Sequence, residues 1–181
     1  MYNDLPQKIN GKFKGKDIVS LDQFSKKDIE ILFLATSKMR KLVQAKGGSN
    51  LLKGKIMSAL FYEPSSRTFG SFVASIQRLG GGFIPLQGMG NSSVVKGESL
   101  EDTIQTFSSY SDVIVIRHSE VGAATIAASA TRLPVINAGD GIGEHPTQAL
   151  LDLYTIYEKH KKLDNLNGVL AGHIKNGRTA H

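Results

Sequence analysis

Residues 112–118 read DVIVIRH, and this run decides the fold prediction. β-branched residues fill its centre, which is typical of a strand buried on both faces. Helical patterns lie on either side of it, over residues 99–110 and over the small-residue stretch 121–131. A buried strand between two helices predicts a parallel sheet whose connections are right-handed crossovers.

The same alternation of strands and helices extends along the chain. Short apolar runs predict further strands over 55–62, 83–87, 133–138 and 168–174. Apolar residues at helical spacing predict further helices from an N-cap at Ser25, with Asp28 three residues on, to Gly47, and over 67–79 and 146–162. Pro85 indicates that its strand lies at an edge of the sheet. The sequence therefore predicts an α/β fold, a mostly parallel sheet with helices on both faces.

Composition narrows the class of protein. The chain has 181 residues, of which 40% are apolar and 21% are charged, as in ordinary globular proteins. It has no cysteine, which excludes a disulfide scaffold, a thiolate nucleophile and a cysteine-ligated metal site. No apolar run approaches the ~20 residues of a membrane span, and the N-terminus lacks the apolar core of a secretory signal. A cytoplasmic protein without a membrane partner is expected.

The formal net charge is +6, which suits nucleic acid, an acidic membrane or an anionic small substrate. The positive residues lie in small scattered groups without interleaved aromatic residues, so nucleic acid is not the expected partner. The five histidines lack the spacing of a metal site. An anionic small molecule is the partner that remains.

The chain ends in an unusual way for an α/β protein. The predicted strand 168–174 is followed only by KNGRTAH, with no helix to complete the unit. We therefore expect one complete domain over residues 1–150, an interdomain helix and linker over 151–167, and the first strand and loop of a truncated second α/β domain over 168–181.

The segment EPSSRTFGSF, residues 63–72, follows a predicted strand and opens a predicted helix. It places hydroxyls, a guanidinium and free backbone N–H groups at one helix N-terminus, from Ser65, Ser66, Arg67 and Thr68. Such an end attracts anions through its dipole and its unpaired amides. The alternative is a serine N-cap beside a solvated arginine. The usual nucleotide-binding glycine patterns are absent, so a small phosphate compound is the expected ligand.

A glycine- and serine-rich loop, NSSVVKGESLEDT, spans residues 91–103. It carries Ser92 and Lys96 and leads into a predicted helix. Taken alone, the pattern favours a surface loop with a solvated lysine.

The third motif, GDGIGEHPTQALLDL, spans residues 139–153. His145 and Gln148 are three residues apart and share a helical face, and Pro146 suits the first helical position. The helix dipole disfavours a charged imidazolium there, so a neutral His145 can donate one N–H to a developing oxyanion. Arg117, at the end of its strand, is expected to face the same crevice. The alternatives are a histidine that caps the helix and an arginine in a structural ion pair.

These motifs together resemble the aspartate carbamoyltransferase catalytic chain, within the aspartate/ornithine carbamoyltransferase superfamily. EPSSRT is similar to the family's phosphate motif, SVVKGES to its mobile loop, and AGDGIGEHPTQALLDL to its His-Pro-Thr-Gln helix. GRTAH is similar to the family's entry into the aspartate domain. The likeness covers essentially the whole chain, with four motifs in order. One departure is His173, where the family usually has aspartate.

The resemblance implies a carbamoyl phosphate-binding domain over residues 1–150 and an early step of de novo pyrimidine biosynthesis. The carbamoyl group passes from carbamoyl phosphate to the amine of L-aspartate, with no covalent enzyme intermediate, metal or cofactor. The implied carbamoyl phosphate-binding residues are Ser65, Ser66, Arg67, Thr68, Ser92, Lys96, Arg117, His145 and Gln148. Of these, the implied catalytic residues are Arg67, Thr68, Lys96, Arg117, His145 and Gln148. Lys96 and Arg178 are the implied aspartate-binding residues.

In the family, Ser92 and Lys96 reach the site of a neighbouring subunit, which implies a homotrimer with shared sites, and regulatory chains are possible partners. Little turnover is expected from the chain by itself, because much of the aspartate site lies in the second domain. Two alternatives stay open: a catalytically silent fragment that binds carbamoyl phosphate or forms the trimer, and an ornithine carbamoyltransferase.

Overall fold

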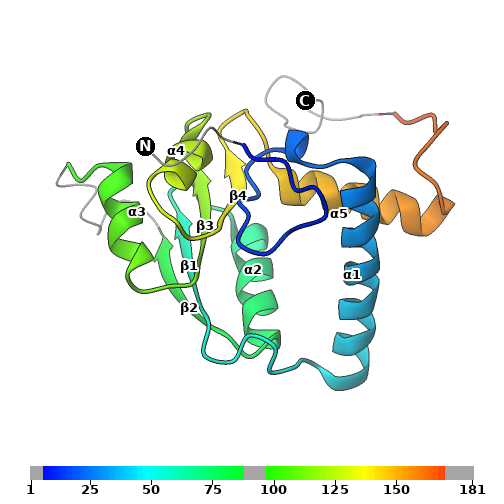
Figure 1. Ribbon diagram of the computed structural model, residues 1–181, viewed down its shortest axis with the longest axis horizontal. Helices are drawn as coiled ribbons and strands as arrows, with labels where there is room; N and C mark the ends of the chain where they lie inside the picture. The colour runs from blue at the N-terminus through cyan, green and yellow to red at the C-terminus, as the bar shows by residue number, and fades with distance from the viewer. Residues whose placement is uncertain (1–5, 88–96, 170–181) are drawn as a thin grey trace.

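The computed structural model describes residues 6–87 and 97–169, and these alternate between strands and helices (Figure 1). The strands are β1 (Ile56–Phe61), β2 (Gly82–Gln87), β3 (Val113–His118) and β4 (Val135–Asp140). The helices are η1 (Leu21–Gln23), α1 (Lys26–Lys46), α2 (Ser66–Arg78), α3 (Leu100–Ser108), α4 (Ala123–Ser129) and α5 (Pro146–His160). Among the described helices, none is both long and apolar enough to cross a membrane.

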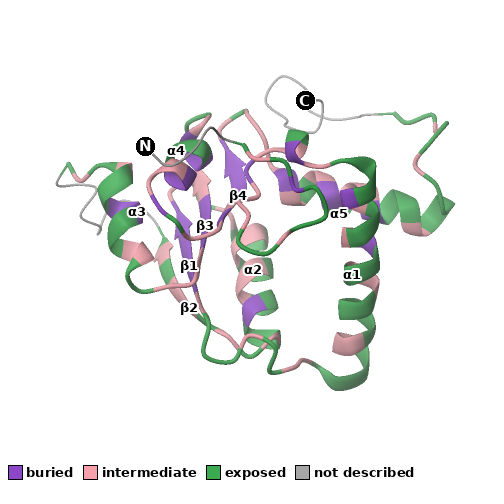
Figure 2. Ribbon diagram, in the orientation of Figure 1, coloured by how far each residue is buried: buried purple, intermediate pink, exposed green. Residues whose placement is uncertain are grey.

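The four strands form one sheet in the order β2-β1-β3-β4, and every pairing is parallel. The prediction of a parallel sheet is confirmed, and so is the edge position of the strand that holds Pro85, since β2 pairs with β1 alone. Figure 2 shows the consequence for burial, with buried residues concentrated on β1, β3 and β4 and none on β2.

Alternate side chains of each central strand point to opposite faces and form two cores. In β3, Ile114 and Ile116 pack with α3 and α4, whereas Val115 packs on the α2 face. In β1, Leu60 belongs to the first core and Phe61 to the second. A sheet buried in this way needs helices on both faces, and this prediction is also confirmed.

The N-terminal segment closes the sheet beside β4, which the sequence patterns did not predict. The N–H of Ile18 donates to the carbonyl of Val135 at 2.8 Å, and its carbonyl accepts the N–H of Asn137 at 2.8 Å. Gln23, which is 1% exposed, holds the segment together from within. The segment thereby satisfies backbone groups of β4 that would otherwise be exposed at an edge.

Helix α1 begins and ends where its sequence signals predict. Ser25 is the N-cap, and it forms a reciprocal capping box with Asp28. Gly47 ends the helix with φ 73°, a left-handed conformation that glycine adopts without strain. The helix packs against α5 through Phe33, whose ring meets that of Tyr154 edge-on at 5.2 Å.

Two strand predictions need comment. The strand predicted over 133–138 extends to Asp140, so the prediction that residues 139 and 140 belong to a loop is wrong. The extension follows from an irregularity in the pairing with β3, which brings Asp140 opposite His118. The strand predicted over 168–174 lies largely outside the described residues, and residues 168–169 are not in a strand.

Candidate active site

The carboxyl ends of parallel strands are the usual place for a binding site in an open α/β sheet. Two of the predicted motifs and the predicted residue Arg117 meet there. The loop after β1 leads into α2, Arg117 lies one residue before the end of β3, and the loop after β4 leads into α5. Because β1, β3 and β4 are neighbours in the sheet, the sheet order itself brings these motifs together.

The N-terminus of α2 carries the predicted anion site. Ser65 occupies the N-cap position, but its side chain makes no capping hydrogen bond, so the alternative of a serine cap is not what the structure shows. The first helical bond runs from the N–H of Phe69 to the carbonyl of Ser65 at 3.0 Å. The three N–H groups before it therefore face out of the helix end.

The side chains at this helix end are at least partly exposed to solvent and free to bind a ligand. Ser66 and Arg67 are exposed, and Ser65 and Thr68 are half-buried. Within the described ranges, the side chains of residues 65–68 form no hydrogen bond or ion pair, and the carbonyl of Thr68 accepts the hydroxyl of Ser71 at 2.8 Å. Unengaged hydroxyls, a guanidinium and free amides at the positive end of a helix dipole are suited to a phosphate group.

Arg117 connects the strand ends. Its side chain is 11% exposed, and Nη2 forms an ion pair of 3.1 Å with Oε2 of Glu63, in the loop after β1. Nη1 donates to the carbonyl of Ala138 in β4 at 3.1 Å. The structural ion pair that was the alternative for Arg117 is thus present. The guanidinium thereby bridges the loop after β1 and strand β4.

His145 occupies the N-cap position of α5, immediately before Pro146. Its side chain makes no capping hydrogen bond, and Nδ1 lies 3.2 Å from the hydroxyl of Thr147. Gln148, one turn into the helix, is exposed, and its amide donates to the carboxylate of Asp152 at 3.1 Å. In this structure the side-chain amide of Gln148 is therefore hydrogen-bonded to another residue of α5.

The wall beside these residues includes Tyr62, which directly follows β1. Its ring packs against that of His118 with centroids 4.8 Å apart. Burial raises the pKa of the Tyr62 phenol, so the group stays neutral at physiological pH. Tyr62 and His118 thus add a packed pair of rings at the ends of β1 and β3.

Several predicted residues cannot be placed. Ser92 and Lys96 of the loop motif, and His173 and Arg178 near the end of the chain, lie outside the described residues. The sequence motifs also missed three carboxylates that support the site: Glu63, which pairs with Arg117, and Asp140 and Glu144, which shape the loop before His145. The sequence signal that could have found them is that all three acidic residues stand within the two motif segments, 63–72 and 139–153.

A separate hollow of about 690 Å³ lies at the other end of the helices. Its wall comes from residues 46–50, at the end of α1, and from the last turns of α2. Arg78 there already donates to the carbonyl of Gly47 at 2.8 Å. None of residues 65–68, Arg117, His145 or Gln148 lines this hollow, so we place the candidate site at the strand ends instead. Within the described residues, no group of three or more acidic or histidine side chains is arranged to hold a metal ion.

Comparison with known proteins finds a family match, similar sequences and similar solved structures. The family described as aspartate/ornithine carbamoyltransferase, carbamoyl-P binding domain, matches residues 16–158. The aspartate carbamoyltransferase catalytic subunit of Thermococcus kodakarensis is 49% identical over 169 residues, which cover 93% of this chain and 54% of the relative. The multifunctional protein pyr1-3 of Dictyostelium discoideum is 50% identical over 92% of this chain and 8% of its own length.

Solved structures agree. The aspartate transcarbamoylase of Trypanosoma cruzi in complex with carbamoyl aspartate and phosphate matches with a TM-score of 0.88 and 46% identity, over 98% of this chain and 54% of that chain. The same enzyme with N-(phosphonacetyl)-L-aspartic acid matches with a TM-score of 0.87 and 48% identity. The chain thus spans about half the length of the single-function relatives it matches.

Proposed function

The chain belongs to the aspartate/ornithine carbamoyltransferase family, and from this premise we propose that it forms the carbamoyl phosphate-binding part of an aspartate carbamoyltransferase. The enzyme would transfer the carbamoyl group to L-aspartate, giving N-carbamoyl-L-aspartate and phosphate, an early step of de novo pyrimidine biosynthesis. The observation that carries the proposal is the uncommitted donor set at the N-terminus of α2. The relatives and structures described above, which are named for the aspartate reaction, favour aspartate over ornithine as the acceptor.

The phosphate group of the substrate would lie at the N-terminus of α2. A phosphate offers only hydrogen-bond acceptors, and this helix end offers donors. They are the hydroxyls of residues 65, 66 and 68, the guanidinium of Arg67 and the outward-facing N–H groups. Charge-assisted hydrogen bonds to an anion are each about twice as strong as neutral ones. This end of α2 therefore supplies most of the binding energy that we assign to carbamoyl phosphate.

The carbonyl oxygen of the substrate would be polarised by Thr68, Arg117 and His145. The amine of aspartate attacks the carbonyl carbon, and the C=O electron pair moves onto oxygen to give a tetrahedral oxyanion. Donors held in place before the reaction stabilise that charge without reorganising. The oxyanion collapses, the bond from carbon to the bridging oxygen breaks, and the amine proton passes to the departing phosphate. Gln148 would accept a hydrogen bond from the carbamoyl nitrogen after its amide leaves Asp152.

The assembly and the second substrate belong to the same proposal. We assign residues 1–150 to the carbamoyl phosphate domain, 151–167 to the connection, and 168–181 to the start of an aspartate domain. Ser92 and Lys96 would complete a neighbouring site in a homotrimer, with regulatory chains as possible partners, and Lys96 and Arg178 would contact aspartate. Sedimentation of the chain with and without a phosphate ligand tests the trimer.

A second function is favoured by the length of the chain. Because it spans about half of its single-function relatives, the chain by itself would bind carbamoyl phosphate but turn over little aspartate. Calorimetry beside an assay for carbamoyl aspartate separates these two properties. Binding without turnover is the expected result, and efficient turnover by the 181-residue chain would contradict it.

The central test replaces Arg67 by Ala and uses Arg78→Ala as its matched control. Both arginines are exposed and belong to α2, but Arg78 lies in the last turn, at the opposite end. The probe is phosphonoacetamide, in which a methylene group replaces the bridging oxygen of carbamoyl phosphate. Loss of charge-assisted bonds worth about 1.5–3 kcal/mol predicts about a tenfold or greater loss of affinity for Arg67→Ala. Equal affinities for both variants would contradict the phosphate site.

A further inference from the structure

Asp140 is a buried carboxylate at the end of β4, and its side chain lies between two loops. The residue is 6% exposed. Oδ2 accepts the N–H of Gly122 at 2.9 Å, and Oδ1 accepts the N–H of Glu144 at 2.7 Å. Gly122 is the N-cap of α4, and Glu144 lies just before α5. One side chain therefore joins the loop after β3 to the loop after β4.

The backbone of Asp140 closes the second loop on itself. Its N–H donates to the carbonyl of Glu144 at 3.2 Å, and its carbonyl accepts the N–H of Gly143 at 2.9 Å. Gly141 adds a bond from its N–H to the carbonyl of His118 at 2.8 Å. With φ 55°, a Cβ at Gly141 would stand 2.4 Å from the carbonyl oxygen of Ser119. The loop thus has little freedom to adopt another conformation.

Glu144 is held at four points. Asp140 engages its N–H and its carbonyl, and its own carboxylate accepts the hydroxyl of Ser20 and the N–H of Leu21, each at 2.7 Å. His145 is the next residue, and Nδ1 of its ring lies 3.2 Å from the hydroxyl of Thr147 in α5. The bonds to Glu144 fix the backbone from which the imidazole projects, and the contact with Thr147 acts on the ring itself.

The geometry points to Asp140 as a positioning residue for His145, an inference that rests on the proposed function of His145. Asp140 acts through the backbone of Glu144 and does not touch the substrate. Its carboxylate accepts the N–H of Glu144, and its backbone N–H donates to the carbonyl of Glu144 in the peptide that precedes His145. The backbone from which the imidazole projects is thereby held in one place before carbamoyl phosphate arrives. Such support matters because a catalytic group displaced by about 1 Å can lose about a hundredfold in rate.

The test compares Asp140→Asn with Asp112→Asn. Asp112 directly precedes β3, at the amino end of the strands and away from Asp140, and it also accepts a backbone N–H, from Ile56 at 2.9 Å. The first readout is the NMR signal of the His145 ring in the 181-residue chain, assigned with His145→Gln. The second is the calorimetric affinity for phosphonoacetamide. Asn can accept only one N–H well and presents an amide donor to the other, so Asp140→Asn breaks the junction.

We expect Asp140→Asn to move the His145 ring signals toward those of an unstructured histidine. We also expect it to lower the affinity for phosphonoacetamide about tenfold. Asp112→Asn should leave both readouts at wild-type values, even where it lowers the unfolding midpoint. If Asp140→Asn keeps the wild-type ring signals and affinity, or changes them no more than Asp112→Asn does, the inference is overturned.

A second variant decides the case in which Asp140→Asn does not fold. In Gly143→Ala, the new Cβ would stand 2.8 Å from Oδ1 and 2.9 Å from the carbonyl oxygen of Asp140, so it pushes on the same junction without removing the charge. Shifted His145 signals in this variant support the inference, and unchanged signals overturn it. Failure of the proposed function looks different: wild-type chain would not bind phosphonoacetamide, while the ring signals of the free chain would still respond to both variants.

Discussion

The carboxylate of Glu144 accepts a 2.7 Å hydrogen bond from the hydroxyl of Ser20, 124 positions earlier in the chain. Its other oxygen accepts the N–H of Leu21 at 2.7 Å. The N-terminal segment is thereby joined to the loop that precedes His145. Support for the candidate site thus reaches beyond the strand ends and includes residues near the start of the chain.

Replacing Glu144 by Ala should loosen this junction. The Ser20 hydroxyl and the Leu21 N–H would lose a charged acceptor in a half-buried place, which predicts a loss of about 1–3 kcal/mol in the free energy of unfolding. Urea denaturation measures it. Glu30→Ala is the control, because Glu30 is exposed near the start of α1, and it should change stability little. A loss in Glu144→Ala no larger than in the control would show that the junction does not stabilise the fold.

Gln23 provides a second test of the N-terminal segment. Its Oε1 accepts the N–H groups of Val19 and Ser20 at 2.7 and 3.0 Å, and its Nε2 donates to the carbonyls of Gln7 and Asp17 at 2.9 and 2.8 Å. Gln23→Met keeps the size but leaves these backbone groups without partners. Each orphaned buried group costs about 1–3 kcal/mol, so the loss should exceed that of most single substitutions.

The control for Gln23 is Gln44→Met, the same substitution at an exposed position of α1. Thermal and urea unfolding should place the control close to wild type. If both variants unfold at the same urea concentration, the four bonds of Gln23 add nothing to stability.

Local signals account for what the sequence predicted well. The limits of α1 follow from Ser25 and Gly47, which act within one turn of themselves. The edge position of β2 follows from Pro85, because proline cannot donate to a neighbouring strand. Ser65 was predicted at a helix N-terminus because its segment follows an apolar strand and opens a helix, and His145 because Pro146 suits the first helical position. These features depend on residues that are neighbours in the sequence, so one sequence is enough to predict them.

The features that the sequence did not predict depend on contacts between residues that are far apart in the chain. The role of Glu144 depends on Ser20, and the pairing of Glu63 depends on Arg117 in another strand. The end of β4 at Asp140 depends on an irregularity opposite His118. None of these can be inferred from periodicity or spacing, because the contacts exist only after the sheet has assembled.

Acid should destabilise the protein partly through Asp28. Its pKa lies below the ordinary value because the carboxylate accepts the hydroxyl and N–H of Ser25 and the N–H of Gly11. A lowered pKa means that the folded state prefers the carboxylate, so the stabilisation is complete above about pH 4 and is lost as the pH falls through the folded-state pKa. Asp28→Asn should therefore flatten the loss of unfolding free energy between about pH 5 and about pH 3.

Asp17→Asn is the matched comparison, with the opposite sign. Burial raises the pKa of Asp17, so the folded state binds that proton more readily, and stability from this group falls as the pH rises through the raised value. The Asp17→Asn substitution should therefore make the unfolding free energy fall more steeply as the pH is lowered. Urea titrations across the pH range measure both slopes, and slopes that change in the same direction would contradict the assignment.

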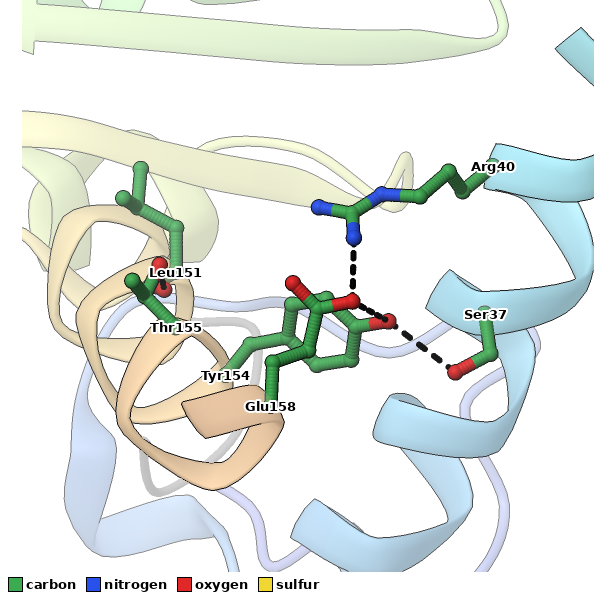
Figure 3. Close-up of polar contacts among 6 residues, drawn as sticks. All are labelled: Ser37, Arg40, Leu151, Tyr154, Thr155 and Glu158. Atoms are coloured by element: carbon green, nitrogen blue, oxygen red, sulfur yellow. Dashed lines mark hydrogen bonds and ion pairs between the residues drawn. The ribbon is translucent and has the colours of Figure 1, made fainter. Parts of the chain in front are cut away.

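The contact between α1 and α5 is built around Tyr154 (Figure 3). Its hydroxyl lies 3.0 Å from that of Ser37 and donates to Glu158 at 3.4 Å, while Arg40 pairs with Glu158 and stands 5.4 Å from the tyrosine ring centroid. Tyr154→Phe removes only the hydroxyl bonds and should cost about 0.5–1.5 kcal/mol. Tyr154→Ala also removes the ring from Phe33 and should cost about 3–5 kcal/mol.

The control for Tyr154 is Tyr110→Phe, at a tyrosine that is 53% exposed. Unfolding in urea should leave that control unchanged. Because the Arg40–Glu158 pair is largely exposed, added salt should change the Tyr154→Phe difference little. A Tyr154→Ala loss as small as that of Tyr154→Phe would mean that the ring does not hold the two helices together.

Glycine-to-alanine substitution should have opposite effects at Gly70, inside α2, and at Gly48, which contacts the last residue of α2. Gly70 lies inside the helix, is exposed, and has no atom within 4 Å of a new Cβ, so alanine should stabilise the fold by about 0.5–1 kcal/mol through its higher helix propensity. At Gly48 the new Cβ would stand 2.4 Å from the carbonyl oxygen of Arg78. That oxygen already accepts the N–H of Ser49 at 2.6 Å, so neither backbone can move away easily. Gly48→Ala should therefore cost about 1–3 kcal/mol. Thermal unfolding of the two variants decides the matter, because a shift of the same sign in both would show that backbone contact at Gly48 does not limit that position.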